Sequence, residues 1–306
     1  MIYTVTLNPA IDCIMQVESF CPGKTNRAGT SVCLPGGKGI NVSVVLRNLG
    51  TDSVLLGFLA GFTGEEIRRM LLHQGCCCDF ITVPSGFSRI NVKLKGAEET
   101  EINGAGPFIS QADTEKLMAQ TRALKSGDIL VLAGSIPAGI SQSIYEDMMQ
   151  QLSGKAVSVV VDAEGALLRR SLKYRPFFIK PNHHELGALF RTEIRCPEEA
   201  VHYGRLLQKM GARNVLVSMA EQGAVLCTET GRVLHQSAAK GTVINSVGAG
   251  DSMVAGFLAG WQKTGDYEAA LRMGTAAGAA SAFSMQLASE ADVQCILRTL
   301  PQATEF

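Results

Sequence analysis

The segment from Asn245 to Ser252 has the strongest chemical pattern in the sequence. It reads Asn-Ser-Val-Gly-Ala-Gly-Asp-Ser and leads into an apolar stretch with helical spacing. Glycines at a helix start let an anion approach backbone N–H groups, and the helix dipole favours negative charge there. The dinucleotide-binding fingerprint is absent, because Met253 stands where its third glycine belongs. We therefore expect an anion site at this helix start, formed by Gly248, Ala249 and Gly250.

Asp251 lies in the first turn of the same expected helix. A carboxylate is electrostatically favoured at a helix N-terminus, so capping is one interpretation. The other is catalytic: the carboxylate faces the bound anion and accepts a proton from a reacting group. Because aspartate is ionised at pH 7 at its ordinary pKa, this role is expected to need no large pKa shift.

A second glycine-rich segment runs from Pro35 to Asn41, Pro-Gly-Gly-Lys-Gly-Ile-Asn, and also leads into a helical pattern. It is not a P-loop, because Gly39 occupies the Ser/Thr position and the upstream glycine is missing. It is either a tight turn or a site where small residues leave room for a polyhydroxy ligand. In the second case its candidate contacts are Gly36, Gly37, Lys38 and Asn41.

Asn182 and Glu185 form a third grouping, because residues three apart meet on one helical face. They can order water around Mg²⁺, which keeps much of its hydration shell. The adjacent His183 and His184 do not indicate zinc, since neighbouring residues on a helix point apart.

Basic residues alternate along the stretch Ser-Arg-Ile-Asn-Val-Lys-Leu, where Arg89 and Lys93 share one strand face with Asn91. A solvated strand face is the ordinary interpretation of this pattern. Arginine also holds phosphate with a fixed fork of donors. Together with Asp12 and Arg27, these residues are candidates for binding a phosphorylated ligand.

Composition bounds the class of protein. The 306 residues allow one large α/β domain, and we expect a single domain over residues 1–306. Lys plus Arg and Asp plus Glu number 28 each, so no general field attracts nucleic acid or an anionic membrane. No apolar run approaches the roughly 20 residues of a membrane-spanning helix, and the start lacks signal-peptide regions. Nine cysteines, three of them adjacent, indicate reduced thiols. We expect a cytoplasmic protein without nucleic-acid or membrane partners.

The elements that must position these groups follow from hydrophobic periodicity. Short apolar runs ending in small or polar residues predict strands at 2–7, 53–59, 129–132, 157–161, 177–179 and 215–217. Helical spacing predicts helices at 40–49, 64–74, 111–124, 142–152, 197–210 and 251–262. This alternation predicts an α/β fold, a doubly wound, mainly parallel sheet flanked by helices. Such sheets bind ligands beyond the carboxyl ends of their strands.

Residues 12–34 and 86–103 break the alternation, because polar and apolar residues alternate there with period two. We expect a small extra β-sheet, too small for an independent domain, that serves as a lid. Lid sheets with exposed apolar faces often pair with another copy. A homodimer through the lid is therefore expected.

Taken together, these segments resemble the ribokinase-like (PfkB) carbohydrate kinases over essentially the whole chain. Residues 36–41 resemble the first family signature, residues 248–251 the second, and Asn182-x-x-Glu185 the magnesium-associated motif. Within the family, the chain is most similar to the 1-phosphofructokinase and tagatose-6-phosphate kinase branch. The segments that carry this likeness are 4–12, 26–28, 89–93, 100–103 and 248–253.

Two positions depart from the family pattern. Asn245-Ser246 stand where Asp-Thr commonly precedes the glycine signature, which removes an upstream acid. Ala133-Gly134-Ser135 stand where the branch often has Ser-Gly-Ser, which removes one serine hydroxyl and keeps Gly134 and Ser135.

The resemblance implies an enzyme that uses ATP and Mg²⁺ to phosphorylate a sugar phosphate, with Asp251 as the base. The implied acceptor contacts are Asp12, Arg27, Gly36, Gly37, Lys38, Asn41, Arg89, Asn91, Lys93, Asn103 and Ser135. The implied nucleotide contacts are Lys180, Asn182, Glu185, Ser218, Glu221 and Gly223, with Asn182 and Glu185 holding magnesium largely through water.

The segments Asn-Pro-Ala-Ile-Asp and Arg-Ile-Asn-Val-Lys are more similar to 1-phosphofructokinase than to the other member of the branch. The preferred reaction is therefore the conversion of fructose 1-phosphate to fructose 1,6-bisphosphate. Tagatose 6-phosphate or an unphosphorylated sugar is the alternative acceptor. A catalytically silent sugar-phosphate-binding protein is the alternative of another class, and the presence of Asp251 weighs against it. A nicotinamide dehydrogenase is excluded by the absent fingerprint.

Overall fold

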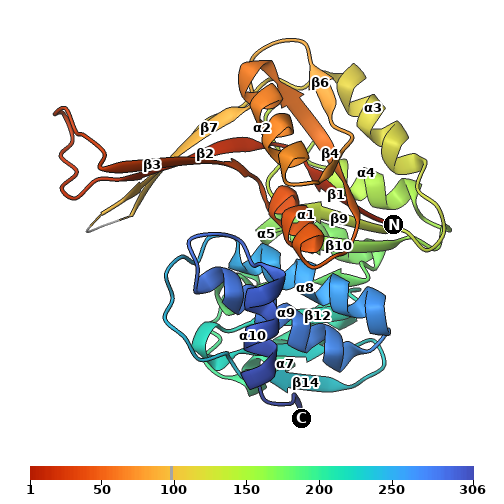
Figure 1. Cartoon of the computed structure of the whole chain (residues 1–306). Helices are drawn as coiled ribbons and strands as arrows, with labels where there is room; N and C mark the ends of the chain where they lie inside the picture. The colour runs from red at the N-terminus through yellow and green to blue at the C-terminus, as the bar shows by residue number, and fades with distance from the viewer. Residues whose placement is uncertain (97–98) are drawn as a thin grey trace.

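Short apolar strands alternate with helices along most of the chain, and they build one twisted main sheet (Figure 1). The computed structural model describes residues 1–96 and 99–306. Eleven strands lie in the order β15-β14-β13-β12-β11-β10-β9-β1-β4-β5, with β6 paired to β4. Their bounds are β1 Ile2–Thr6, β4 Ser53–Ala60, β5 Cys77–Cys78, β6 Ile81–Val83, β9 Ile129–Ala133, β10 Ser158–Asp162, β11 Phe178–Ile179, β12 Asn214–Ser218, β13 Ala224–Cys227, β14 Val233–Gln236 and β15 Thr304–Glu305. From β5 to β12 all pairs are parallel, whereas β13, β14 and β15 are added antiparallel.

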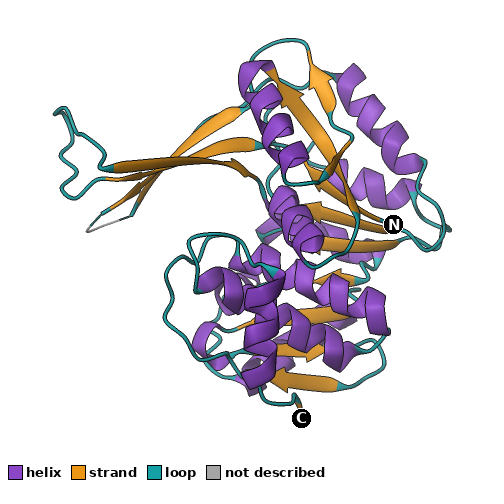
Figure 2. Ribbon diagram, in the orientation of Figure 1, coloured by secondary structure: helices purple, strands orange, loops and turns teal. Residues whose placement is uncertain are grey.

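Helices cover both faces of this sheet (Figure 2). One face carries α1 Lys38–Asn48, α2 Gly61–His73, α8 Ala249–Thr264, α9 Tyr267–Ala282 and α10 Glu290–Thr299. The other carries α3 Gln111–Arg122, α4 Ile144–Gln151, α5 Gly165–Ser171, α6 His183–Phe190 and α7 Pro197–Lys209. The predicted doubly wound fold class is confirmed. Within the described residues no helix is both long and apolar enough to span a bilayer.

Burial on both faces explains the continuous apolar strands. In β9, Leu130 and Leu132 join one core and Ile129 and Val131 join the other, because successive side chains point to opposite faces. Each fully buried aliphatic side chain contributes about 1.5–3 kcal/mol relative to exposure. The two cores therefore fix the strand ends that carry the polar groups.

Four strands form the lid, in the order β3-β2-β7-β8. They are β2 Ala10–Gln16, β3 Thr30–Gly36, β7 Arg89–Lys95 and β8 Thr100–Asn103. The sheet is mixed, since β2 pairs antiparallel with β3 and parallel with β7. It projects away from the helices as a long arm (Figure 1), and residues 17–29 form the loop that joins β2 to β3. The lid strands begin two residues earlier than the expected boundary at 12, and part of the expected range at 86–103 lies outside the described residues.

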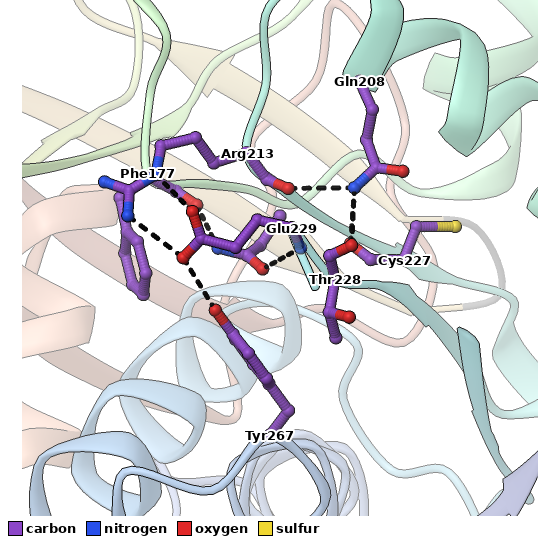
Figure 3. Close-up of polar contacts among 8 residues, drawn as sticks. Phe177, Gln208, Arg213, Cys227, Thr228, Glu229 and Tyr267 are labelled. Atoms are coloured by element: carbon purple, nitrogen blue, oxygen red, sulfur yellow. Dashed lines mark hydrogen bonds and ion pairs between the residues drawn. The ribbon is translucent and has the colours of Figure 1, made fainter. Parts of the chain in front are cut away.

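A polar network fastens the antiparallel end of the main sheet (Figure 3). Arg213, just before β12, donates from Nε and Nη2 to the two carboxylate oxygens of Glu229, at 2.6 and 3.0 Å. Tyr267 at the start of α9 donates from its hydroxyl to the same carboxylate at 2.9 Å. Gln208 of α7 donates to the carbonyl of Arg213 at 2.9 Å. The network lies at the amino end of β12, so it supports the sheet from the end opposite the strand ends that face the lid.

Several helices begin earlier in the structure than the sequence predicts. The expected starts at 40, 64 and 251 are Lys38, Gly61 and Ala249 in α1, α2 and α8. Glycine has low helix propensity, so the glycines at these starts favoured a loop assignment. The β13–β14 hairpin and the last two helices were not predicted.

Candidate active site

The candidate site is built around the start of α8. Gly248 is the N-cap residue and has φ 78°, a left-handed conformation that favours glycine. Asp251 lies in the first turn and is only 6% exposed. Its Oδ2 accepts a 2.7 Å hydrogen bond from Nδ2 of Asn41, which lies in the first turn of α1. The two glycine-rich signatures therefore meet at one point.

The carboxyl group of Asp251 has an unusual proton affinity. Burial and the negative charge of Asp162 raise its pKa to about 7. The Asn41 hydrogen bond and the charges of Lys38 and Lys180 oppose this shift. The expectation that Asp251 needs no large pKa shift is therefore wrong, because its burial was not visible in the sequence.

Asp162 is the group that the sequence analysis left out of the site. It ends β10, is 3% exposed, and its Oδ2 accepts no hydrogen bond. Lys38 Nζ lies 3.5 Å from Oδ2, and Lys180 Nζ lies 4.0 Å from Oδ1. Burial opposes the charge of Lys38, but Asp162 and Asp251 outweigh it and raise the pKa of Lys38. The signal was present, since Asp162 follows an apolar strand at its carboxyl end.

In the turn of α8 that follows Gly248, the glycines let neighbouring side chains lie close to the helix backbone. A Cβ on Gly250 would lie 3.0 Å from Nζ of Lys180, and a Cβ on Gly248 would lie 2.7 Å from Cδ2 of Leu287. Lys180 is 6% exposed, so its ammonium group lies against the first turn of the helix. Ala249 N–H donates a long hydrogen bond to the Ser246 carbonyl at 3.3 Å. The helix dipole and this lysine together make a site suited to a phosphate.

Five residues of the lid strands lie close together where acceptor contacts are expected: Asp12, Gly36, Asn91, Lys93 and Glu101. Oδ1 of Asp12 accepts a 2.8 Å hydrogen bond from Asn91 Nδ2, and Oδ2 lies 3.2 Å from Lys93 Nζ. These residues face one another on β2 and β7 because the register pairs Asp12 with Asn91. A Cβ on Gly36 would lie 2.5 Å from Cγ of Asp12, so that position admits no side chain without displacing the carboxylate. Glu101 lies 3.9 Å from Lys93 and completes the ionic group.

A cavity of about 650 Å³ lies between the lid and the carboxyl ends of β1, β9 and β10. Arg89, half-buried, donates from Nε to the carbonyl of Asn8 at 3.0 Å. Burial lowers the pKa of Arg89, partly against the charge of Asp12. The predicted residues that line the cavity are Gly37, Lys38, Arg89, Asn103, Gly134 and Ser135.

Arg27 lies elsewhere. It is exposed on the loop at the far end of the lid and lines a separate hollow formed by residues 16–19 and 25–30. Within one chain the structure does not bring Arg27 to Arg89. The resemblance groups Arg27 with Arg89 as contacts of the acceptor phosphate and gives no indication of this separation.

Asn182 and Glu185 form a capping box at the start of α6. Glu185 N donates to Asn182 Oδ1 at 2.8 Å, and Asn182 N donates to Glu185 Oε2 at 2.8 Å. The box uses one oxygen of Glu185. In the described parts of the chain, no group of three or more His, Cys, Asp or Glu side chains is arranged to hold a metal. Mg²⁺ commonly takes one or two carboxylates and keeps water and substrate phosphates as its other ligands. Glu185 and Asp162, whose Oδ2 contacts Lys38 Nζ at 3.5 Å, are carboxylates that fit that mode.

The expected nucleotide wall follows β12. Ser218 ends this strand and bridges to Asn182. Glu221 is exposed on the short helical turn 220–222. Gly223 has φ 84°, and a Cβ there would lie 2.0 Å from the carbonyl oxygen of Gln236. The glycine is thus required by the backbone of the hairpin, independently of any ligand.

Comparison with known proteins identifies the class to which this site belongs. The pfkB family carbohydrate kinase model matches residues 4–292. The chain therefore belongs to the pfkB family of carbohydrate kinases, and it is a phosphotransferase with an alcohol acceptor. Enzymes of this family use ATP with Mg²⁺, in agreement with the phosphate-binding helix start and the two carboxylates described above.

Individual relatives narrow the comparison. The 1-phosphofructokinase of Bacillus subtilis (strain 168) is 48% identical over 97% of this chain and 97% of its own length. The D-tagatose-1-phosphate kinase of Bacillus licheniformis is 38% identical over 94% of each chain. The crystal structure of phosphofructokinase-2 from Escherichia coli in complex with fructose-6-phosphate is 27% identical, with a TM-score of 0.88 over 98% of each chain.

Proposed function

We propose that this chain transfers the γ-phosphoryl group of ATP to the C6 hydroxyl of fructose 1-phosphate. The products are fructose 1,6-bisphosphate and ADP. The observation that carries the proposal is the buried carboxylate of Asp251, which accepts a hydrogen bond from Asn41 at a helix start flanked by Lys38 and Lys180. The names of several relatives support the acceptor.

The proposed chemistry is a single in-line displacement. The C6 oxygen forms a bond to the γ-phosphorus, the bond from that phosphorus to the β,γ-bridging oxygen breaks, and the hydroxyl proton moves to Asp251. With a pKa of about 7, Asp251 is a stronger base than an ordinary carboxylate and is still substantially ionised at neutral pH. The Asn41 amide engages Oδ2 of the carboxylate, which leaves Oδ1 to accept the proton.

Other residues stabilise charge. The N–H groups of residues 248–250 bind the equatorial oxygens of the transferred group, and Ala249 N–H exchanges its 3.3 Å bond to the Ser246 carbonyl for one of these oxygens. Lys38 and Lys180 neutralise phosphate charge, and Asp162 holds both ammonium groups in place. Mg²⁺, when bound, supplies further neutralising charge between the ATP phosphates, with Glu185 and Asp162 as the residues that hold it through water.

The acceptor pocket is assigned to the lid side of the cavity. Asp12, Gly36, Gly37 and Asn41 surround the sugar hydroxyls in this proposal. Arg89, Asn103 and Ser135 line the cavity, whereas Lys93 lines a second hollow together with Asp12 and Asn41. Arg89, Lys93, Asn103 and Ser135 are the proposed contacts of the substrate phosphate. Because two phosphates must be held at opposite ends of one ketohexose, cations are needed at both ends.

Tagatose 1-phosphate is the second candidate acceptor, because a relative at 38% identity is named for it. The relatives thus agree on a 1-phosphate, which favours tagatose 1-phosphate over the tagatose 6-phosphate expected from the sequence. Fructose 6-phosphate is the competitor suggested by the Escherichia coli structure. In the furanose form C1 and C6 are both exocyclic CH₂O carbons, attached to the two ring carbons that flank the ring oxygen, so the same pocket can be entered in either direction.

We further propose a homodimer through the lid. Ile14 and Val32 pair across β2 and β3 on the lid face that also carries Asp12, and Val32 is 53% exposed. The two outer strands, β3 and β8, also leave free backbone edges. A second lid packed on this face would bring its 17–29 loop toward the site, so Arg27 would serve the partner's acceptor phosphate. A single domain and a cytoplasmic location complete the proposal, and nine free thiols agree with a reducing compartment.

The test is a coupled ADP-release assay with Mg-ATP and five acceptors in parallel: fructose 1-phosphate, tagatose 1-phosphate, fructose 6-phosphate, tagatose 6-phosphate and fructose. We expect the highest kcat/KM with fructose 1-phosphate. A preference for tagatose 1-phosphate would keep the mechanism and change the acceptor. Absence of turnover on all five, with binding of ATP retained, would overturn the proposed function in favour of a silent binding protein.

A further inference from the structure

Two cysteine thiols face each other at the middle of the β2–β3 strand pair of the lid. Cys13 on β2 lies directly opposite Cys33 on β3 in the antiparallel register. Their Sγ atoms are 2.7 Å apart. Both residues are free cysteines, and Cys33 is exposed while Cys13 is half-buried.

The strand pairing already has the dimensions of a disulfide. Directly opposed residues in an antiparallel pair have Cα atoms about 4.5–5.5 Å apart, within the roughly 4.4–6.8 Å range that disulfides span. An S–S bond is about 2.05 Å long. The two sulfur atoms therefore need to approach by less than one bond length, with no change of register.

This arrangement is specific to one pair. Cys76, Cys77 and Cys78 are consecutive, and Cys227 is buried. Across residues 1–96 and 99–306, no other two thiols lie within hydrogen-bonding distance of each other. Cys21 is exposed on the loop of the same lid and makes no thiol contact there.

We propose that Cys13 and Cys33 are a redox modification site, where a small-molecule disulfide such as oxidised glutathione introduces a reversible disulfide. The Cys33 thiolate attacks one sulfur of the oxidant, and one small thiolate leaves. The Cys13 thiolate then attacks the Cys33 sulfur of the mixed disulfide, and the second small thiol leaves. The protein loses two protons and two electrons, and the oxidant is reduced to two thiols.

The order of attack follows from access and acidity. Cys33 is exposed and meets the oxidant first. Burial and the neighbouring Cys33 thiol raise the pKa of Cys13 to about 11, so Cys13 is a poor first nucleophile. It is nevertheless in contact with Cys33, and this proximity makes it an effective resolving thiol.

The bond would link two strands that both serve the proposed active site. Asp12 precedes Cys13 on β2, and β3 leads directly into Gly36 and Lys38. A covalent link at this point closes the 17–29 loop and restrains the lid relative to α1. We expect oxidation to lower kcat several-fold and to raise the thermal midpoint, and dithiothreitol to reverse both effects. The kcat readout, but not the covalent readouts, rests on the proposed function.

The experiment incubates the reduced full-length chain with oxidised glutathione, blocks the remaining thiols with iodoacetamide, and maps the peptides by mass spectrometry under non-reducing conditions. We expect a linked pair containing Cys13 and Cys33, an intact mass lower by two hydrogen atoms, and seven of the nine thiols still alkylated. Cys33→Ser should abolish the link. Cys21→Ser, which removes an exposed thiol from the same lid, should retain it.

Three outcomes would overturn the site: a persistent glutathione adduct on Cys33, a link between other cysteines, or nine unmodified thiols after exposure to the oxidant. A Cys13–Cys33 link that leaves kcat and the thermal midpoint unchanged would contradict the proposal that the bond restrains the lid. An inactive reduced protein that still forms the link would contradict the proposed function and leave the redox site supported.

Discussion

Asn41 Nδ2 lies 2.7 Å from Asp251 Oδ2, although 210 positions separate the two residues. Asn41 belongs to the first turn of α1 and Asp251 to the first turn of α8. The hydrogen bond therefore joins the starts of two helices, each preceded by its own glycine-rich segment. It also sets which oxygen of the carboxylate is engaged and which is left for the acceptor.

Replacing Asp251 with Asn should remove activity and stabilise the protein at alkaline pH. Loss of the base is expected to lower kcat by about 10²–10⁴-fold. Because the folded pKa of about 7 lies above the unfolded value, the native state binds the proton more tightly. The protonated carboxyl group therefore contributes on the order of 4 kcal/mol to the free energy of unfolding of the wild type. This contribution is complete below the unfolded pKa and is lost as pH rises through 7. Thermal unfolding at pH 5 and pH 8.5 measures the effect.

Asp113→Asn is the matched control for that experiment. Asp113 is also a buried carboxylate, but Lys116 and Ser110 hold its pKa below the ordinary value. Its contribution to stability is present above the unfolded pKa and is lost as pH falls. The substitution should therefore lower stability at neutral pH and leave kcat unchanged. An Asp251→Asn variant that is destabilised in the same way would contradict the raised pKa of Asp251.

The pH dependence of kcat/KM should follow the titration of Asp251. Activity should rise with pH and approach a plateau above about 7, because only the ionised carboxylate accepts the proton. Asp162→Asn removes the neighbouring negative charge, so the midpoint of the profile should move to lower pH. Glu164→Gln is the control: Glu164 is exposed and solvent screens its 3.7 Å ion pair with Lys38, so the midpoint should stay in place. A midpoint unaffected by Asp162→Asn would argue that another group controls the profile.

Gly250→Ala should lower activity without unfolding the protein. The added methyl group would lie 3.0 Å from Nζ of Lys180, a flexible side chain that can move away. Displacing this cation from the phosphate site should lower kcat/KM by on the order of 10-fold or more. Gly265→Ala, at the C-cap of the same helix, is the control. Gly265 has φ 65° and open space around it, so alanine there should cost about 1 kcal/mol of stability and leave turnover unchanged. Equal kinetic effects from the two variants would point to a general disturbance of α8.

Mixing two variants with complementary defects tests the proposed dimer. Arg27→Ala should raise KM for the acceptor, and Asp251→Asn should remove the base. If Arg27 serves the partner's site, a mixed dimer has one complete site, and random pairing restores about a quarter of the wild-type sites. Activity measured after co-refolding the two variants at low acceptor concentration gives the answer. No recovery in a preparation that contains mixed dimers would place the action of Arg27 within its own chain.

The sequence by itself determined the fold class and the principal motifs. Apolar runs such as those of β9 and β12 are buried on both faces, so their composition alone predicts a covered parallel sheet. Period-two alternation around Arg89 predicted the lid for the same local reason. Glycines 248 and 250 mark a close approach of backbone to the side chains of Leu287 and Lys180, and the need for a small residue at such a position is a local requirement that sequence records well.

Only the tertiary structure decided how charges and distant segments meet. The pKa of Asp251 depends on its burial and on Asp162, which a different strand contributes, so spacing along the chain carries no information about it. Asn182 and Glu185 satisfy each other in a capping box before any metal is considered. The resemblance groups Arg27 with Arg89 as contacts of the acceptor phosphate, but the length of the lid separates them, as the strand pairing dictates. Periodicity reports the local surroundings of a residue, whereas electrostatics and reach depend on which segments the folded sheet places side by side.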